Sequence, residues 1–367
     1  MGKLRTVFGY AGRIARRECE YRAGKLRQVS IDLTYRCNLR CEICSLWRIK
    51  PEDVDELTLD EWLRVIDEFA EMGVREIGLI GGEPTIVKGF VDIMRRIKSH
   101  KMKLVVTTNA TTLPKFMSEF CSLVDTLYIS VDAHDKRHDR IRGIDGLLDR
   151  VIDSIRQLVA YRREQGLTKP EIHIHATVTK TNPDVITDMV RMGDELGIDV
   201  VSFQYITCSS QEAVNRTTVG GKVIASDRYT TNDIGSLLLD DDGIRILRAQ
   251  LDSIPSTKHV VPVTRPLRNL SDHSLRTGDF PVKRCVPISN QMSIRPNGDV
   301  TVCSQIEGMT MGNLRQNSVR EIWCGEARRK ARRILSHKLF PVCRNCCAFS
   351  TALTPTQLAK VALDRKL

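Results

Sequence analysis

The stretch Cys37-Asn38-Leu39-Arg40-Cys41-Glu42-Ile43-Cys44 decides how the rest of the chain is interpreted. It carries three cysteines in a C-x3-C-x2-C pattern, directly after a run of strand-forming residues at 28–34. Three thiolates on one short loop can hold three irons of a [4Fe-4S] cluster and leave the fourth iron without a protein ligand. An open iron can bind and reduce a small molecule, whereas ferredoxins that only transfer electrons normally use four cysteines. The alternative is zinc, but zinc sites are usually built from C-x2-C pairs and need a fourth ligand.

The length and composition indicate a globular protein. A chain of 367 residues, 41% hydrophobic and 28% charged, is long enough for one large domain and a smaller one. No apolar run approaches the ~20 residues of a membrane span. The first thirty residues are basic and lack the apolar core of a secretory signal. We therefore expect a cytoplasmic protein, in which the presence of 12 cysteines favours metal ligation over disulfides.

The net charge of +11 favours an acidic partner. Candidates are an anionic substrate, a nucleic acid or an anionic membrane surface, and the alternative is a generally basic solvated surface. Aromatic residues make up only 5% of the chain and do not alternate with basic ones, so no nucleic-acid partner is expected. Residues 1–27 form a basic, helix-permissive segment that we expect to pack on the protein, with peripheral membrane contact as the alternative.

Between residues 28 and 206 the strand and helix patterns alternate. Thr58 and Glu61 form a capping box for a helix that ends near Gly73. Further helices are predicted at 90–99, 113–121, 147–164 and 184–196. Strands are predicted at 28–34, 76–80, 103–108, 126–131, 171–178 and 199–206. This order predicts an α/β fold, with a parallel sheet curled as a partial (β/α)6 TIM-type barrel.

Three of the predicted strands have one polar face. The polar positions are Tyr128, Ser130, Asp132, Glu171, His173, His175, Thr177, Ser202 and Gln204. A barrel with a filled interior would place apolar residues on both faces of its strands. We therefore expect an open lumen that holds a ligand, with a solvated sheet face as the alternative.

The remainder of the chain does not continue the alternation of strands and helices. Residues 207–284 contain Ser/Thr-rich stretches, one helix at 244–254 and a Pro/Arg segment, and we expect them to bridge two modules and to shape access to the lumen. A small C-terminal module at 285–350 has a β-hairpin turning at Asn297-Gly298 and a helix at 319–337. A tail at 351–367 follows.

A second motif, Gly81-Gly82-Glu83-Pro84, follows the strand at 76–80. Glycines let the backbone approach a ligand closely, the glutamate supplies a carboxylate, and the proline fixes the exit of the turn. A C-x3-C-x2-C loop followed by this motif resembles the radical SAM superfamily. The resemblance implies that the open iron binds S-adenosylmethionine. Reductive cleavage of S-adenosylmethionine then yields a 5′-deoxyadenosyl radical, which takes a hydrogen atom from a substrate C–H bond.

The resemblance also implies roles for single residues. Cys37, Cys41 and Cys44 would ligate the cluster, and Ile43 would lie against the adenine, where the family usually has an aromatic residue. The methionyl amino group would be bound by the turn Gly81-Gly82-Glu83-Pro84. Contacts with the rest of the cofactor would come from residues at the ends of the next two strands, Asn109, Ser130 and Asp132. Arg142 would pair with the methionyl carboxylate through two parallel hydrogen bonds. The alternative for these polar residues is a helix-entry position or a surface ion pair.

The C-terminal cysteines resemble a SPASM/Twitch extension. Cys285, Gly298 and Cys303 match its C-x12-G-x4-C opening, and Cys343 and Cys346 form a later C-x2-C pair. No cysteine follows Cys347, so the ligands suffice for one auxiliary [4Fe-4S] cluster, held by Cys285, Cys303, Cys343 and Cys346. Cys347 as the fourth ligand and a four-cysteine zinc site are the alternatives.

We therefore expect a radical SAM enzyme that oxidises or rearranges an anionic small metabolite, such as a sugar, nucleotide or lipid headgroup. His173, His175 and Gln204 are the candidates in the lumen for substrate contact or proton removal, although core histidines are the commoner outcome. A flavodoxin- or ferredoxin-type donor would supply the electron. One alternative is a SPASM-type maturase that modifies a peptide or protein side chain. Another is a non-catalytic iron–sulfur or zinc protein that binds nucleic acid, which would need neither Glu83 nor Arg142.

Overall fold

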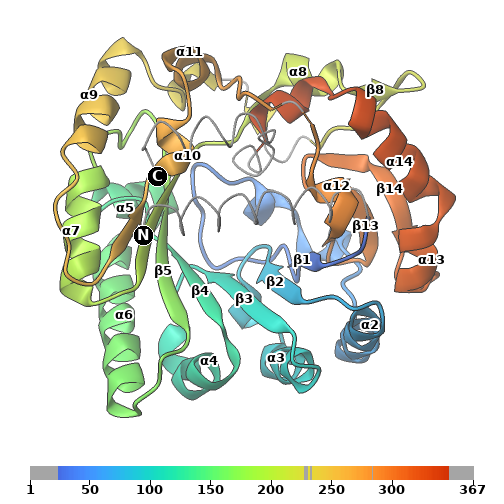
Figure 1. Ribbon diagram of the computed structural model, residues 1–367, viewed down its shortest axis with the longest axis horizontal. Helices are drawn as coiled ribbons and strands as arrows, with labels where there is room; N and C mark the ends of the chain where they lie inside the picture. Colours follow the sequence, from blue (N-terminus) through green and yellow to red (C-terminus); the bar gives the residue numbers. More distant parts are fainter. Residues whose placement is uncertain (1–23, 227–229, 232–233, 283, 347–367) are drawn as a thin grey trace, which may run out of the picture.

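The computed structural model describes residues 24–226, 230–231, 234–282 and 284–346, and all that follows concerns these residues. One ten-stranded sheet organises them, in the order β11-β6-β5-β4-β3-β2-β1-β12-β13-β14 (Figure 1). Its centre consists of β1 Gln28–Asp32, β2 Glu76–Ile80, β3 Lys103–Thr108, β4 Thr126–Ser130, β5 Glu171–Val178 and β6 Val200–Tyr205. Each of these strands pairs in parallel with the next, which confirms the predicted partial barrel. The basic segment before residue 24, Cys347 and the tail at 351–367 lie outside the described residues.

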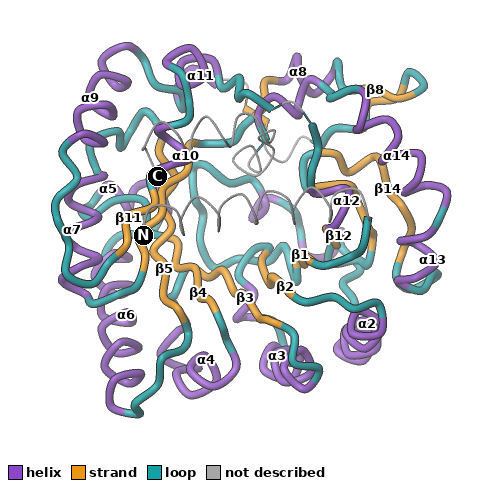
Figure 2. Tube along the Cα trace, in the orientation of Figure 1, coloured by secondary structure: helices purple, strands orange, loops and turns teal. Residues whose placement is uncertain are grey.

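Helices cover the outer face of the curved sheet (Figure 2). They are α2 Leu59–Glu71, α3 Phe90–Ser99, α4 Met117–Leu123, α6 Leu147–Glu164 and α7 Ile186–Leu196. α2 starts with the predicted capping box: the Thr58 N–H donates to Glu61 at 2.7 Å, and the Glu61 N–H donates to the Thr58 hydroxyl at 3.3 Å. The short helix α5 Arg137–Arg142 was not predicted, because its six residues are too few to show a periodic pattern.

Both edges of the sheet are extended by later parts of the chain. β12 Gln291–Ile294 pairs in parallel with β1, and β13 Asp299–Cys303 and β14 Ile306–Asn313 continue the sheet in antiparallel order. At the other edge, β11 Val261–Val263 pairs in parallel with β6. This strand was not predicted because Pro262 argues against a strand in the sequence. A proline, which has no N–H to donate, is nevertheless tolerated on an edge strand. The C-terminal module is therefore continuous with the barrel sheet.

The segment 207–284 contains more regular structure than the one predicted helix. Its elements are β7 Ser209–Ser210, α8 Gln211–Asn215, β8 Thr218–Val219, β9 Lys222–Val223, β10 Thr230–Thr231, α9 Asp241–Asp252, α10 Arg265–Arg268 and α11 Asp272–Thr277. Most of these are too short to show a periodic pattern in the sequence.

The long C-terminal helix predicted at 319–337 is two helices, α13 Val319–Cys324 and α14 Glu326–His337. Gly325 separates them with extended backbone angles, and a Cβ on it would lie 2.6 Å from the carbonyl oxygen of Glu321. The prediction was wrong here because the apolar pattern continues through the break. The module also contains α12 Pro287–Asn290 and a 3-10 turn at Pro341–Asn345.

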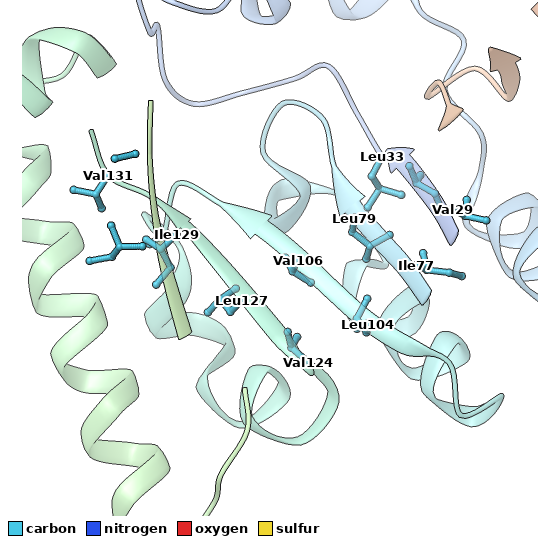
Figure 3. Close-up of a cluster of buried hydrophobic side chains, with 14 of the residues drawn as sticks. Val29, Leu33, Ile77, Leu79, Leu104, Val106, Val124, Leu127, Ile129 and Val131 are labelled. Atoms are coloured by element: carbon cyan, nitrogen blue, oxygen red, sulfur yellow. The ribbon is translucent and has the colours of Figure 1, made fainter. Parts of the chain in front are cut away.

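The core lies between the sheet and its outer helices, and Figure 3 shows part of it. Alternate strand residues such as Ile77, Leu104 and Ile129 are 0% exposed and face the helices. The opposite face carries the polar residues, so that His173 and His175 are half-buried between fully buried isoleucines. This alternation directs polar groups into the lumen. None of the described helices is both long and apolar enough to cross a membrane.

Candidate active site

The loop between β1 and α2 brings its three cysteines into one cavity of about 140 Å³. The cavity lies at the carboxyl ends of β1 to β4, where parallel barrels place their reactive groups. Its lining includes Cys37, Cys41, Cys44, Gly81, Gly82, Glu83, Asn109, Ser130 and Arg142. The structure thus brings together residues that span more than one hundred positions of the chain. Ile43, Pro84 and Asp132, which were predicted alongside them, do not line this cavity.

The two glycines of the turn after β2 are required by a close approach of two backbone segments. Gly82 donates to the Thr34 carbonyl at 2.7 Å, and the next residue, Glu83, donates to the Arg36 carbonyl at 2.9 Å. A Cβ on Gly82 would overlap the carbonyl of Arg36, and Gly81 has a φ of +119°. These contacts fix the start of the cysteine loop against the turn that carries Glu83.

The Glu83 side chain is 1% exposed, and its carboxylate accepts hydrogen bonds from three neighbouring residues. It accepts hydrogen bonds from the Thr85 hydroxyl at 2.6 Å, the Thr108 hydroxyl at 2.7 Å and the Asn109 N–H at 2.8 Å. Burial raises the pKa of Glu83, although these hydrogen bonds act in the opposite direction. A cationic ligand group beside it would restore the ionised form, as the ammonium of an amino acid does.

Arg142 is held between a buried carboxylate and the cysteine loop. Its Nε donates to Asp132 Oδ2 at 2.6 Å, and its Nη1 lies 3.9 Å from the Cys41 sulfur. Asp132 is 0% exposed, and its other oxygen accepts from the Thr177 N–H at 3.0 Å. Burial by itself would lower the pKa of Arg142, but the charges of Asp132 and Cys41 outweigh burial and raise it. Asp132 therefore stands behind Arg142 and orients it toward the cavity.

The backbone also ties α5 to the cysteine loop. The Glu42 N–H donates to the Ile141 carbonyl at 2.9 Å, and the Arg40 N–H donates to the Arg142 carbonyl at 3.4 Å. The helix that carries Arg142 and the loop that carries the cysteines are thus positioned together.

Trp47 lines the same cavity and was missed in the sequence. Its indole N–H donates to the Cys41 carbonyl at 3.1 Å. The guanidinium groups of Arg40 and Arg48 lie 5.4 Å and 5.0 Å from its ring centroid, within the range of cation–π contacts. The sequence could have indicated this role, because the tryptophan lies three residues after the last cysteine of the loop and next to a basic residue.

A second cavity, of about 190 Å³, lies in the C-terminal module. Its lining includes all four predicted auxiliary ligands, Cys285, Cys303, Cys343 and Cys346. Ile80 lines both this cavity and the one beside the cysteine loop, so the two cavities adjoin. The side chains of Leu335 and Leu339 close it on the side of α14.

The thiols of both cavities fit an iron–sulfur cluster better than a single metal ion. Burial raises the pKa of Cys37 to about 11, that of Cys343 to about 11 and that of Cys285 to about 12. Bound metal cations would hold such thiols as thiolates. Within the described ranges, no three His, Cys, Asp or Glu side chains converge closely enough to hold one ion. Zinc would need its sulfurs about 2.3 Å from a common centre, whereas a cube of four irons accepts a wider spacing.

The predicted lumen residues line a third cavity, of about 490 Å³. His173, His175, Ser202 and Gln204 contribute to it, and so does Tyr128, whose ring lies 4.8 Å from that of His173. Among the described residues that line it there is one carboxylate, Glu171, and no lysine or arginine.

This third cavity neighbours the one beside the cysteine loop. His175 pairs directly across the sheet with Ser130, which lines the cysteine cavity. His175 Nδ1 lies 2.8 Å from the Ser202 hydroxyl, and that hydroxyl donates to the Ile174 carbonyl at 3.2 Å. His175 also forms a hydrogen bond with the Gln204 side chain, so both Ser202 and Gln204 hold its ring. Burial lowers the pKa of His175, which keeps the ring neutral near pH 7.

Comparison with known proteins agrees with this geometry. A family model of the radical SAM superfamily matches residues 31–181, and one of the SPASM iron–sulfur cluster-binding domain matches residues 285–347. Over 344 residues the chain is 24% identical to the tungsten-containing aldehyde ferredoxin oxidoreductase cofactor-modifying protein of Pyrococcus furiosus, covering 88% of this chain and 87% of the relative. Over 295 residues it is 25% identical to the sporulation killing factor maturation protein SkfB of Bacillus subtilis, covering 80% of this chain but only 63% of that relative.

A crystal structure of Streptococcus suis SuiB bound to its precursor peptide SuiA has the same fold. The TM-score is 0.58 at 17% identity, over 90% of this chain and 74% of SuiB. The two family matches cover the cysteine loop, the Gly-Gly-Glu-Pro turn and the auxiliary cysteines in the predicted order. The chain therefore belongs to the radical SAM superfamily, as an enzyme with a C-terminal SPASM domain that uses S-adenosylmethionine, a [4Fe-4S] cluster and auxiliary iron–sulfur chemistry.

Proposed function

We propose that this enzyme modifies a side chain of a peptide or protein, which enters the cavity lined by His173, His175 and Gln204. The observation that carries this proposal is the lining of that cavity. It adjoins the S-adenosylmethionine site, measures about 490 Å³, and offers no lysine or arginine among its described residues. A net charge of +11 favours an anionic metabolite, but none of the described residues that line the cavity is a lysine or an arginine. A neutral or cationic side chain fits this lining better than a phosphate or carboxylate.

Two relatives support a peptide substrate. SkfB is named as a maturation protein for a sporulation killing factor, and the SuiB structure contains a precursor peptide. A cofactor-type substrate is the second candidate, because the Pyrococcus furiosus relative is named as a cofactor-modifying protein and matches along most of both chains.

The residues of this chain hold and orient the reactants. S-adenosylmethionine and its cluster, when bound, supply a radical that takes a hydrogen atom from the substrate. We assign Glu83 to the methionyl ammonium and Arg142 to its carboxylate, with Cys37, Cys41 and Cys44 on the cluster. His175 receives the proton that the substrate loses as it is oxidised, and its hydrogen bonds with Ser202 and Gln204 orient the ring.

We assign Gln204 and His173 to substrate contact. Gln204 Nε2 donates to the Thr177 hydroxyl at 3.3 Å, which orients its amide along the strand face. His173 stands next to His175 on the same face of β5 and against the ring of Tyr128.

The test is which class of molecule stimulates turnover. Reconstituted enzyme is supplied with S-adenosylmethionine, dithionite and cell extract divided by dialysis into retained and passing fractions. The retained fraction should accelerate 5′-deoxyadenosine formation, protease treatment of that fraction should abolish the effect, and His175→Ala should lower it. Stimulation that passes the membrane and survives protease would contradict a peptide or protein substrate and favour the second candidate.

We further propose that a flavodoxin- or ferredoxin-type carrier in the cytoplasm exchanges electrons with the enzyme. The three cysteines of the loop after β1 are free thiols, which supports a reducing compartment.

A further inference from the structure

Helix α14 lies at the edge of the C-terminal module (Figure 1), and its residue Leu335 lines the auxiliary cavity. On its inner face, Ala331 and Leu335 are each 1% exposed, and Leu335 lines the cavity of the auxiliary cysteines. Its outer face carries Arg329, Lys330 and Arg333, all exposed and spaced so that they share one side of the helix. One helix therefore contacts the auxiliary site with one face and presents positive charge with the other.

Lys338 follows at the end of this helix, and we call Arg329, Lys330, Arg333 and Lys338 the α14 basic face. None of the four forms an ion pair with an acidic residue in the described part of the chain. Exposed arginines elsewhere do: Arg64 pairs with Glu68 in α2 and Arg156 pairs with Asp153 in α6. Arg329 and Arg333 are like charges four residues apart, a spacing that destabilises a helix. Arg329 donates to the Cys324 carbonyl, but no described carboxylate neutralises the four charges, and a like-charged face of this kind is expected to serve binding.

The chemistry of this face favours an acidic protein over a membrane. A helix that lies on a bilayer needs an exposed apolar face, but Ala331 and Leu335 are buried and Ile334 packs against the core. A partner seated on the basic face would be separated from the auxiliary cavity by about one helix diameter, 10–12 Å. Arg344, directly after the predicted ligand Cys343, is also exposed on this module. A short distance to the auxiliary cavity favours electron transfer to a redox protein, whereas a nucleic acid has no use for it.

We propose that the α14 basic face docks an acidic one-electron carrier protein of the flavodoxin class. The inference rests on the proposed oxidation of the substrate. An auxiliary cluster held by Cys285, Cys303, Cys343 and Cys346 would accept one electron from the substrate radical, and the oxidised flavin of the docked carrier would receive that electron. The substrate loses a hydrogen atom, an electron and a proton in total, and His175 receives the proton. The opposite charges guide the carrier to its site and raise the association rate.

The test compares two variants with the same change of charge. Arg329→Glu/Lys330→Glu/Arg333→Glu reverses the basic face, and Arg150→Glu/Arg156→Glu/Arg163→Glu reverses exposed arginines on α6, on the opposite side of the molecule (Figure 1). Binding of an acidic flavodoxin to each holoenzyme is measured anaerobically by calorimetry at rising salt. The α14 variant should bind about tenfold more weakly than wild type at low salt, and the α6 variant should bind as wild type does. Iron content near the wild-type value shows that each variant is folded.

A second readout is the oxidation of the reduced auxiliary cluster, followed by its absorbance after rapid mixing. Oxidised flavodoxin should react about tenfold more slowly with the α14 variant, while a small neutral oxidant should react equally with all three proteins. Equal flavodoxin binding by the α14 variant and wild type would overturn the proposal. So would equal losses in the two variants, or a loss of affinity only for a single-stranded oligonucleotide or anionic vesicles. Because these measurements need no substrate, their outcome is independent of whether the substrate is a peptide.

Discussion

Replacing Asp132 with asparagine should destabilise the folded enzyme by about 3–5 kcal/mol, because it leaves a buried guanidinium without its counter-charge. Asp132 is 0% exposed, the Arg142 side chain is 13% exposed, and the two groups are 2.6 Å apart. The oxygen of asparagine can still accept from the Thr177 N–H, so the loss reports the charge and the hydrogen bond to Arg142 rather than the one to Thr177. The pair also orients Arg142, so the affinity for S-adenosylmethionine should fall with the stability.

A double-mutant cycle isolates the interaction of this pair. Asp132→Asn and Arg142→Gln are measured alone and together by urea unfolding of the anaerobic holoenzyme, followed by far-ultraviolet circular dichroism. The double variant replaces the pair with two neutral groups, so we expect a coupling energy of about 2–3 kcal/mol. The control cycle uses Asp153 and Arg156, whose side chains are 64% and 65% exposed, and should give less than about 1 kcal/mol. A coupling at the Asp132–Arg142 pair no larger than that of the control would refute the reasoning.

Two further predictions concern the turn after β2 and a buried histidine. Gly82→Ala places a methyl group 2.7 Å from the carbonyl carbon of Arg36 and should lower the iron bound after reconstitution severalfold, whereas Gly78→Ala, with 3.9 Å to its nearest neighbour, should leave iron binding unchanged; equal iron content in the two variants would contradict the clash. Burial lowers the pKa of His138 to about 4, so the unfolded chain takes up a proton as the pH falls below 6.5 while the folded chain does not. Stability should therefore fall by about 2 kcal/mol between pH 7 and pH 5, and His138→Gln should remove most of that dependence in urea unfolding; an unchanged pH profile in the variant would show that His138 is not the group.

The barrel and the main features of both cysteine cavities could be predicted because their signals are local. Alternating strand residues, the capping box before α2 and the spacing of Cys37, Cys41 and Cys44 each depend on a few neighbouring positions. The Gly-Gly-Glu-Pro turn was also visible, since only glycines allow the backbone approach seen at Arg36.

What could not be predicted depends on contacts between distant segments. β11 is a strand only because β6 offers it an edge, and its proline argues against a strand in the sequence. The role of Asp132 depends on Arg142 folding back onto it from α5, and the place of Trp47 depends on how the cysteine loop closes. The lining of the third cavity could not be predicted for the same reason, because net charge does not say where the cations lie.

The most direct test of the account is to count iron and assay S-adenosylmethionine cleavage in the same preparations after anaerobic reconstitution. Wild type should bind about eight irons per chain and release 5′-deoxyadenosine with dithionite. The Cys37→Ala/Cys41→Ala/Cys44→Ala variant should keep about four irons at the auxiliary site and release none. Zinc in place of iron, no 5′-deoxyadenosine from wild type, or cleavage that survives the triple replacement would contradict the account.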